Sequence, residues 1–195
     1  MDSLTYVKAH FENSVATKQA ILNDLGLQQR IVDAAEACIA ALKNGNKILF
    51  AGNGGSAADS QHLAAELVSR FNFDRPGLPS IALTTDTSML TAIGNDYGFL
   101  QLFARQVQAN GREGDVFVGI STSGNSANIL EAVKVAKGMN IVTIALCGNA
   151  GKLPEVCDVT LNVPSTSTPF IQESHIAVGH VLCGLIEEAM FGHLK

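Results

Sequence analysis

The sequence predicts an α/β fold in which a five-stranded parallel sheet is covered by helices on both faces, in three layers, with a helical hairpin at the N-terminus. Three observations predict this fold. Helical periodicity fills the first 45 residues, short apolar runs begin after residue 46, and amphipathic segments separate most of these runs. Runs that are apolar on both faces are typical of strands in a parallel sheet buried on both sides. The 195 residues suit a single domain, with residues 1–45 as helices that pack in an oligomer and residues 46–195 as the sandwich.

The two N-terminal helices are predicted from apolar residues that recur every three or four positions. The first stripe is Leu4, Val7, Phe11 and Val15, and the second is Ile31, Ala35, Cys38, Ile39 and Leu42. The sequence Asn44-Gly45-Asn46 predicts the end of the second helix.

The strands are predicted at residues 47–51, 80–83, 116–120, 141–146 and 159–163. A long helix, apolar on more than one side, is predicted from about residue 171 to residue 191. In open parallel sheets, ligands bind beyond the carboxyl ends of the strands. The turns that follow the first and third strands are therefore the places to look for a site.

Composition excludes several classes of function. Hydrophobic residues make up 47% of the chain and charged residues 16%, so a monomer would expose much apolar surface and we expect a homo-oligomer. The net charge of −5 and the absence of a basic run argue against a nucleic-acid partner. We find neither a signal peptide nor a membrane span, and we therefore expect a cytoplasmic protein. The four cysteines are far apart in the sequence, so we expect buried free thiols.

The loop after the first strand, Gly52-Asn53-Gly54-Gly55-Ser56-Ala57, fits the weak form of the dinucleotide-binding fingerprint. Asp86 could then bind a ribose, and the plainer alternative is that the loop is a tight turn without a ligand. Two helices precede the first strand, and too few residues remain for a separate substrate domain. These features oppose a dehydrogenase, and we expect no nucleotide cofactor.

The loop after the third strand, Ser121-Thr122-Ser123-Gly124-Asn125-Ser126, has four hydroxyls around a glycine and opens a helix. Hydroxyls and free backbone N–H groups at a helix start bind anions. No lysine follows the glycine, so this is not a nucleotide-triphosphate loop. The plain alternative is a serine-rich helix cap, but the phosphate of a small metabolite fits the loop best.

His62 and Glu66 lie four residues apart and therefore share one face of the helix that follows the glycine-rich loop. The last helix offers Gln172, His175 and His180. Histidines and a glutamate together suit a divalent metal or acid–base chemistry. Eight residues separate Gln172 from His180, about 12 Å along a straight helix, so Gln172 could join only from a frayed helix start. Spacing does not prefer His180 over His175.

Other polar segments have plainer interpretations. Residues 94–98, Gly-Asn-Asp-Tyr-Gly, could be only a turn. Arg70 and Arg75 are expected at the surface or an interface, and Phe71 and Phe73 in the core or an interface.

Over nearly its whole length the chain resembles the sugar-isomerase (SIS) domain proteins, and among them the phosphoheptose isomerases. The resemblance rests on the stretches at residues 51–59, 61–62, 65–66, 92–98, 113–116, 119–126 and 171–173. It implies a single SIS domain and the conversion of sedoheptulose 7-phosphate to D-glycero-D-manno-heptose 7-phosphate, the first step toward activated heptose for lipopolysaccharide core or other surface glycans. It also implies a homotetramer with sites at subunit interfaces. The chain departs from the family pattern at Phe170, where relatives commonly have a basic residue.

The resemblance also assigns roles to residues. It places substrate contacts on Asn53, Gly54, Gly55, Ser56, Glu66, Asn95, Asp96, Ser121, Thr122, Ser123, Ser126 and Gln172. It places one zinc ion per subunit on His62, Glu66, Gln172 and His180, which selects His180 over His175 by resemblance alone. Glu66 and His180 suit the catalytic roles of a carbon base and an oxygen acid–base. These roles compete with metal ligation, because a coordinated base is not free to take a proton.

A non-catalytic relative is the main alternative. The replication-initiator-associating protein shares the implied fold and tetramer but lacks the acid–base pair, so Glu66 and His180 favour an enzyme.

Overall fold

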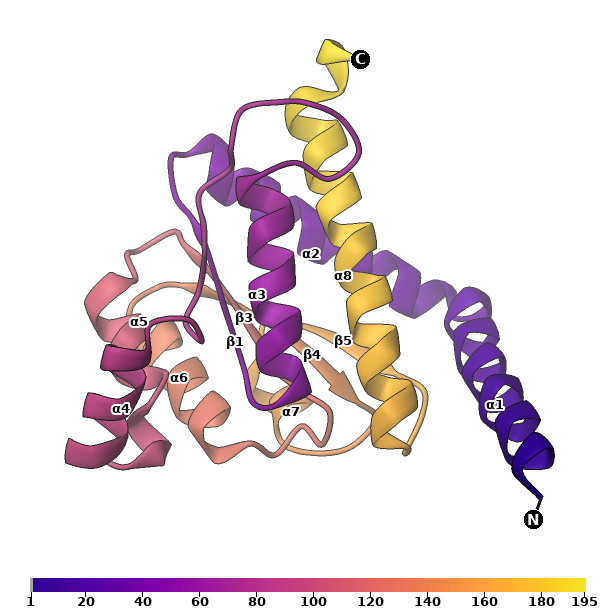
Figure 1. The fold of residues 1–195 in the computed structure, drawn as a ribbon. Coiled ribbons are helices and arrows are strands. Elements are labelled where there is room, and N and C mark those ends of the chain that lie inside the picture. Colours follow the sequence, from indigo (N-terminus) through magenta and orange to yellow (C-terminus); the bar gives the residue numbers. More distant parts are fainter. Residues whose placement is uncertain (1) are drawn as a thin grey trace.

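The computed structural model describes residues 2–195 and confirms the predicted α/β fold (Figure 1). Five parallel strands form one sheet in the order β2-β1-β3-β4-β5. They are β1 (Ile48–Gly52), β2 (Ser80–Ala82), β3 (Val116–Ser121), β4 (Val142–Gly148) and β5 (Val159–Val163). All five predicted strands are therefore confirmed, with bounds that shift by one or two residues at most.

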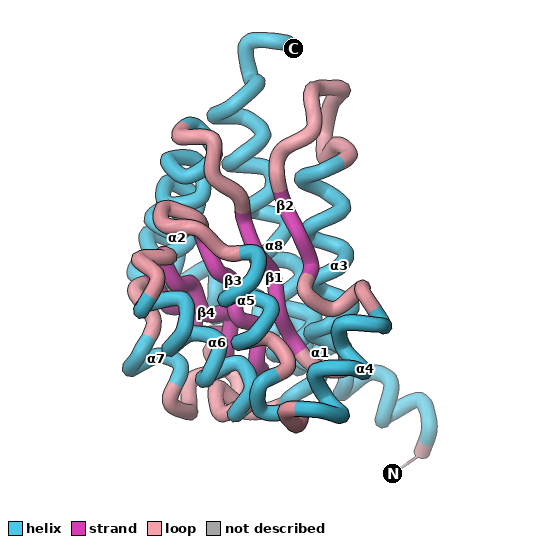
Figure 2. Tube along the Cα trace, turned by 90° about the vertical axis from the view of Figure 1, so that its left-hand side faces the viewer, coloured by secondary structure: helices cyan, strands magenta, loops and turns pink. Residues whose placement is uncertain are grey.

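Helices cover both faces of this sheet (Figure 2). One face carries α2 (Leu25–Lys43), α3 (Gly55–Val68) and α8 (Thr168–Phe191). The other carries α4 (Thr87–Asp96), α5 (Ala104–Asn110), α6 (Ala127–Gly138) and the short α7 (Leu153–Val156). Two 3₁₀ turns lie at Phe99–Gln101 and Gly192–Leu194.

The strands supply side chains to two separate cores because successive residues point to opposite faces. In β1, Ile48 and Phe50 pack with α2, α3 and α8. Leu49 and Ala51 pack with the opposite helices. Both cores exclude water from β1, β3 and β4, which explains why these central strands are buried nearly throughout, whereas the edge strands β2 and β5 are partly exposed.

The N-terminal hairpin consists of α1 (Ser3–Asn23) and α2, and its two helices differ in burial. The stripe predicted for α2 is largely buried, and α2 ends at Asn44 with Gly45 at a φ of +78°. The stripe of α1 is exposed instead, with Leu4 at 81% and Phe11 at 65%. In Figure 1, α1 extends away from the sandwich. The apolar stripe of α1 is therefore left uncovered by the rest of the described chain.

The strand order places the candidate loops side by side. After β1 the chain adds β2 on one side of β1, and the later strands β3, β4 and β5 follow on the other side. The direction of strand addition therefore switches between β1 and β3. Gly52 at the end of β1 is paired with Ile120 near the end of β3. In open α/β sheets, ligands bind at the carboxyl side of such a switch point. Within residues 2–195, no helix is both long and apolar enough to span a bilayer.

Candidate active site

Three of the predicted side chains converge between α3 and α8. The Nε2 atoms of His62 and His180 are 2.9 Å apart, and His62 Nε2 lies 3.3 Å from Glu66 Oε1. One donor atom from each of the three residues lies within 4.8 Å of the others. The side chain of His62 is 47% exposed and that of Glu66 is 23% exposed, so the cluster is open to solvent on one side. Of the two histidines that spacing left open, the structure places His180 beside His62.

A close helix contact produces this convergence. A Cβ on Gly179 would lie 2.5 Å from Leu63 Cδ2, which is closer than two non-bonded carbon atoms can approach. Glycine at position 179 therefore lets α8 approach α3 next to His180, and Leu63 directly follows His62. Neither position stands out in the sequence, because the contact joins helices that are far apart in the chain.

A buried ion pair holds the segment that borders His180. Arg75 Nε donates to Glu187 Oε1 at 3.0 Å, and both side chains are fully buried. Glu187 also accepts the backbone N–H groups of Phe71 and Asn72, and the Phe71 ring lies 5.5 Å from the His180 ring. The expectation that Arg75 is a surface or interface charge is therefore wrong, since its guanidinium also donates to backbone carbonyls, including that of Glu66.

Gln172 lies elsewhere than expected. α8 begins at Thr168, with Pro169 in its first turn, so Gln172 lies a full turn inside the helix and its start is not frayed there. The Gln172 side-chain amide donates to both oxygens of Asp59 at 3.2 Å. It also lies against Gly55, where an added Cβ would be 3.1 Å from Gln172 Cδ. Gln172 therefore contacts the glycine-rich loop, while His180 joins the histidine–glutamate cluster.

Sequence reasoning missed Asp59, which lies one helical turn before His62 on α3. Its residue exposure is 5%, and burial raises the pKa of its carboxyl group, while the Gln172 hydrogen bond and the nearby His62 oppose this rise. The spacing could have identified Asp59, because residues three positions apart share one face of a helix and Asp59 lies three positions before His62.

The hydroxyl loop gathers its serines at the carboxyl end of β3. Ser121 Oγ lies 2.8 Å from Ser126 Oγ and 3.5 Å from Ser123 Oγ. Ser126 precedes α6, but its side chain does not cap the helix. The plain helix-cap interpretation therefore does not describe Ser126. Thr122 is half-buried and Ser123 exposed, so hydroxyls of the loop reach solvent.

The loop after β4 supports the hydroxyl loop from behind. Backbone N–H groups of Lys152 and Leu153 donate to the carbonyl of Gly124. A Cβ on Gly124 would lie 2.3 Å from the Ala150 carbonyl oxygen, and a Cβ on Gly151 would lie 2.4 Å from the Ser123 carbonyl oxygen. Both glycines have positive φ angles, +65° and +100°. The hydroxyl loop is thus held in shape by its contacts with the loop after β4.

The glycine-rich loop lies next to the hydroxyl loop. Gly54 has a φ of +57° and is exposed together with Gly55, while Ser56 is buried in the first turn of α3. Asn53 reaches across to α6, where its amide exchanges two hydrogen bonds with the amide of Asn128. The two loops are therefore connected by side chains as well as by the sheet.

Asn95 and Asp96 are not brought to this cluster. They lie in the last turn of α4 and not in a free turn, they are exposed, and they bond to each other at 2.8 Å. α4 belongs to the face of the sheet opposite α3 and α8. Phe170, the departure from the family pattern, packs against His10 of α1 with ring centroids 5.0 Å apart.

His175 occupies a different environment from His180. It is 1% exposed, and neither ring nitrogen has a hydrogen-bond partner among the described residues. Burial lowers the pKa of its imidazole to about 4, against a smaller opposing effect of the nearby Cys147 backbone, so the ring is neutral near pH 7.

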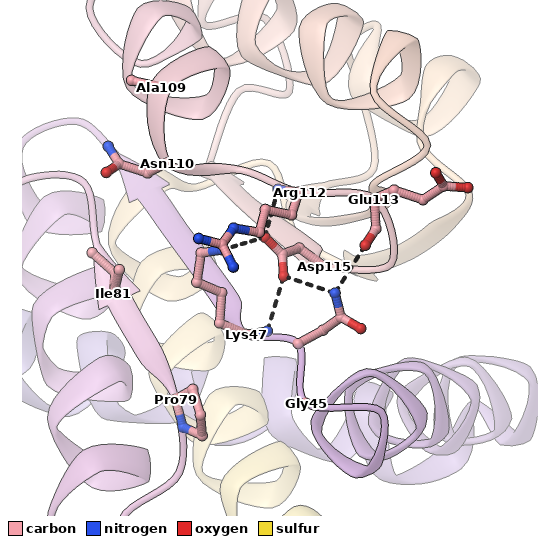
Figure 3. Close-up of a pocket in the computed structure, with 10 residues that line it drawn as sticks. Gly45, Lys47, Pro79, Ile81, Ala109, Asn110, Arg112, Glu113 and Asp115 are labelled. Carbon is pink, nitrogen blue, oxygen red and sulfur yellow. Dashed lines mark hydrogen bonds and ion pairs between the residues drawn. The ribbon is translucent and has the colours of Figure 1, made fainter.

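A second polar region lies at the opposite, amino end of the sheet (Figure 3). A pocket of about 510 Å³ is lined by residues that include Lys47, Asn110, Arg112 and Asp115. Asp115 is fully buried and accepts hydrogen bonds from the Lys47 ammonium at 2.6 Å and from the Arg112 backbone at 2.8 Å. The charges deepest in this pocket are therefore paired with each other.

Comparisons with known proteins agree with this architecture. The family model described as SIS domain matches residues 10–148. A phosphoheptose isomerase of Aneurinibacillus thermoaerophilus is 59% identical over 187 residues, which cover 95% of this chain and 94% of that protein.

Two solved structures are similar over nearly the whole chain. A phosphoheptose isomerase from Neisseria gonorrhoeae is 49% identical with a TM-score of 0.90, and one from Francisella tularensis is 42% identical with a TM-score of 0.92. Each comparison covers 96% of this chain and all of the other chain.

Proposed function

The chain belongs to the SIS-domain family, among its phosphoheptose isomerases, and from that membership we propose that it converts sedoheptulose 7-phosphate to D-glycero-D-manno-heptose 7-phosphate. The product would enter the synthesis of activated heptose for surface glycans. The observation that carries the proposal is the convergence of His62, Glu66 and His180 beside two loops suited to a sugar phosphate. The replication-initiator-associating alternative is not favoured, because close relatives over the full length are isomerases by name.

The reaction moves a proton between C1 and C2 of the sugar and another between the two oxygens. Glu66 carries a partly exposed carboxylate in the cluster, which can take the carbon proton and return it to the neighbouring carbon. The His180 imidazole can exchange a proton with the substrate oxygens, since neutral imidazole both donates and accepts. Hydrogen bonds from the imidazole N–H groups of His62 and His180 would stabilise the enediolate that forms between the two steps.

The donor set also fits a zinc ion. Two imidazole nitrogens and a carboxylate oxygen are typical zinc ligands, and ligand nitrogens at tetrahedral positions lie about 3.3 Å apart. The His62–His180 separation of 2.9 Å needs only a small adjustment to match. When bound, zinc would polarise the sugar carbonyl. Gln172, the fourth proposed ligand, bonds to Asp59 here and would have to turn its amide oxygen toward the cluster.

The hydroxyl loop is the proposed phosphate site. Ser121, Ser123 and Ser126 present their hydroxyls together, and α6 begins directly after them. Hydroxyl donors and the start of a helix stabilise an anion without a nearby lysine or arginine.

A homotetramer would complete the site. The exposed apolar residues of α1, among them Tyr6, Phe11 and Val15, require a partner. Sites at subunit interfaces would also give a role to Asn95 and Asp96, which lie away from the cluster of their own chain. Light scattering should therefore show a tetramer at micromolar concentration, and a stable monomer would contradict this part of the proposal.

The test of the chemistry is Glu66→Gln, which keeps the shape of the side chain and removes the base. We expect solvent deuterium to stop entering the sugar at C1 and C2, with a rate loss on the order of 10²–10⁴-fold, while calorimetry still detects sedoheptulose 7-phosphate binding. Zinc content is measured alongside. Glu113→Gln is the matched control, because Glu113 is exposed at the amino end of the sheet. Near wild-type exchange in Glu66→Gln would remove Glu66 from the chemistry.

A further inference from the structure

Asn128 has no role in the reaction as described above, yet it makes an unusual contact. It is the second residue of α6 and is 3% exposed. Its side-chain amide donates to Asn53 Oδ1 at 3.0 Å and accepts from Asn53 Nδ2 at 2.9 Å. Among the described residues, Asn53 is its only side-chain hydrogen-bond partner. A buried polar side chain is thus devoted to one residue 75 positions earlier in the chain.

This pairing limits the motion of Asn53. The terminal torsion of an asparagine is soft, so an isolated, half-buried amide takes many orientations. In the reciprocal pair, turning one amide over would place nitrogen against nitrogen and oxygen against oxygen, and both hydrogen bonds would be lost. Asn128 cannot turn with it freely, because buried side chains are closely packed. Asn53 therefore keeps one amide plane.

The pair leaves part of Asn53 available. A primary amide has two N–H donors and two acceptor lone pairs on its oxygen. The contact with Asn128 uses one donor and one lone pair, so one of each remains on Asn53. Asn53 lies in the glycine-rich loop at the carboxyl end of β1, beside the hydroxyl loop of β3. The remaining donor and acceptor therefore belong to the end of the sheet where the substrate is proposed to bind.

We propose that Asn128 is a positioning residue for the isomerase: it holds the Asn53 amide in one orientation and ties the glycine-rich loop to the first turn of α6, which directly follows the hydroxyl loop, before substrate arrives. The inference rests on the proposed function, in which the glycine-rich loop that carries Asn53 lies beside the bound sugar phosphate. When the Asn53 amide is already oriented, substrate binding does not have to include the entropic cost of ordering this side chain, so the substrate binds more tightly. Since the contact persists in ground and transition states alike, its loss raises KM more than it lowers kcat.

The experiment is a double-mutant cycle with Asn53→Ala, Asn128→Ala and the double variant, read as KM and kcat for sedoheptulose 7-phosphate. We expect Asn128→Ala to raise KM by about tenfold, as expected for loss of one or two hydrogen bonds, with kcat within about twofold. In the Asn53→Ala background it should add less than about twofold, because Asn128 acts through Asn53. Asn128→Leu, which keeps the number and branching of the side-chain heavy atoms but cannot hydrogen-bond, should repeat the KM effect if the alanine variant folds poorly.

Asn110→Ala is the matched control, since Asn110 is a hydrogen-bonded asparagine at the amino end of the sheet. Its KM should stay at the wild-type value. Fully multiplicative effects of the Asn53 and Asn128 substitutions, or an unchanged KM in both Asn128 variants, would overturn the inference and leave the proposed function intact. An unchanged KM in Asn53→Ala would overturn the inference and also remove Asn53 from the proposed substrate site.

Discussion

Asp115 lies at the amino end of the sheet and Asp59 at the carboxyl end, and both carboxylates are buried. Asp115 accepts hydrogen bonds from two backbone N–H groups and from the side chains of Lys47 and Asn46. Burial alone would raise its pKa, but these bonds lower the pKa of Asp115 below its usual value. Among residues 2–195, Asp59 accepts a hydrogen bond only from the Gln172 amide, and burial raises the pKa of its carboxyl group.

The same contrast holds for other buried polar groups. Both nitrogens of His175, on the second turn of α8 after the carboxyl end of β5, lack partners among the described residues. At the amino end, the corresponding orphan is a single hydroxyl, Ser80 Oγ. Buried polar groups in native proteins are normally satisfied, and exceptions concentrate at functional sites. The difference teaches that the buried polar groups at the amino end of the sheet are more fully hydrogen-bonded than those at the carboxyl end, which is the end where we propose that the substrate binds.

Asp115→Asn gives the largest expected effect on stability. Asp115 Oδ2 accepts hydrogen bonds from the Lys47 ammonium and the Arg112 backbone N–H. An amide NH2 group in its place would point donors at donors, and the negative charge opposite Lys47 would be lost. We expect a loss of about 3 kcal/mol in the free energy of unfolding, measured by urea titration, with kcat of the folded protein unchanged. Glu66→Gln is the same chemical change at the other end and should show the reverse pattern. If Asp115→Asn kept full stability, the contrast between the two ends would be broken.

The pH dependence of stability tests the orphan imidazole of His175. Its folded pKa of about 4 lies below the ordinary value of 6.5, so the unfolded chain binds a proton first as the pH falls. Stability is therefore lost between pH 6.5 and 4. From pH 7 to pH 5 this group should contribute a loss of about 2 kcal/mol, and His175→Leu should lack that contribution.

His193→Gln is the control for this titration, because His193 is exposed. It should follow the wild-type pH profile at the same protein concentration. Equal pH profiles for wild type and His175→Leu would show that His175 does not titrate as a buried neutral ring.

The smallest expected effect concerns two serines. Ser123→Ala removes a hydroxyl from the proposed phosphate loop and should raise KM about fivefold, with a smaller change in kcat. Ser80→Ala removes an unpaired buried hydroxyl at the amino end and should leave KM unchanged and stability equal or higher. Steady-state kinetics and thermal unfolding of both variants sharpen the contrast. A lower kcat with unchanged KM in Ser123→Ala would mean that the loop does not hold phosphate.

Local patterns in the sequence predicted the sheet and part of the site. The five strands followed from apolar runs, and the His62–Glu66 pair followed from helical spacing, because both signals lie within a few residues of chain. Asn53–Asn128, Asp59–Gln172 and Arg75–Glu187 join residues 75, 113 and 112 positions apart, and no local pattern specifies them. The choice of His180 over His175 likewise depended on how α8 rotates against α3, which Gly179 and Leu63 determine.

The backbone contact between Gly124 and Gly151 also has a consequence for how this chain can evolve. A side chain added at either glycine would collide with the backbone of the other loop. A viable change therefore requires compensating movement in both loops at once. Mutational drift in the loop after β4 is consequently constrained by the hydroxyl loop, and the two loops should diversify together or not at all.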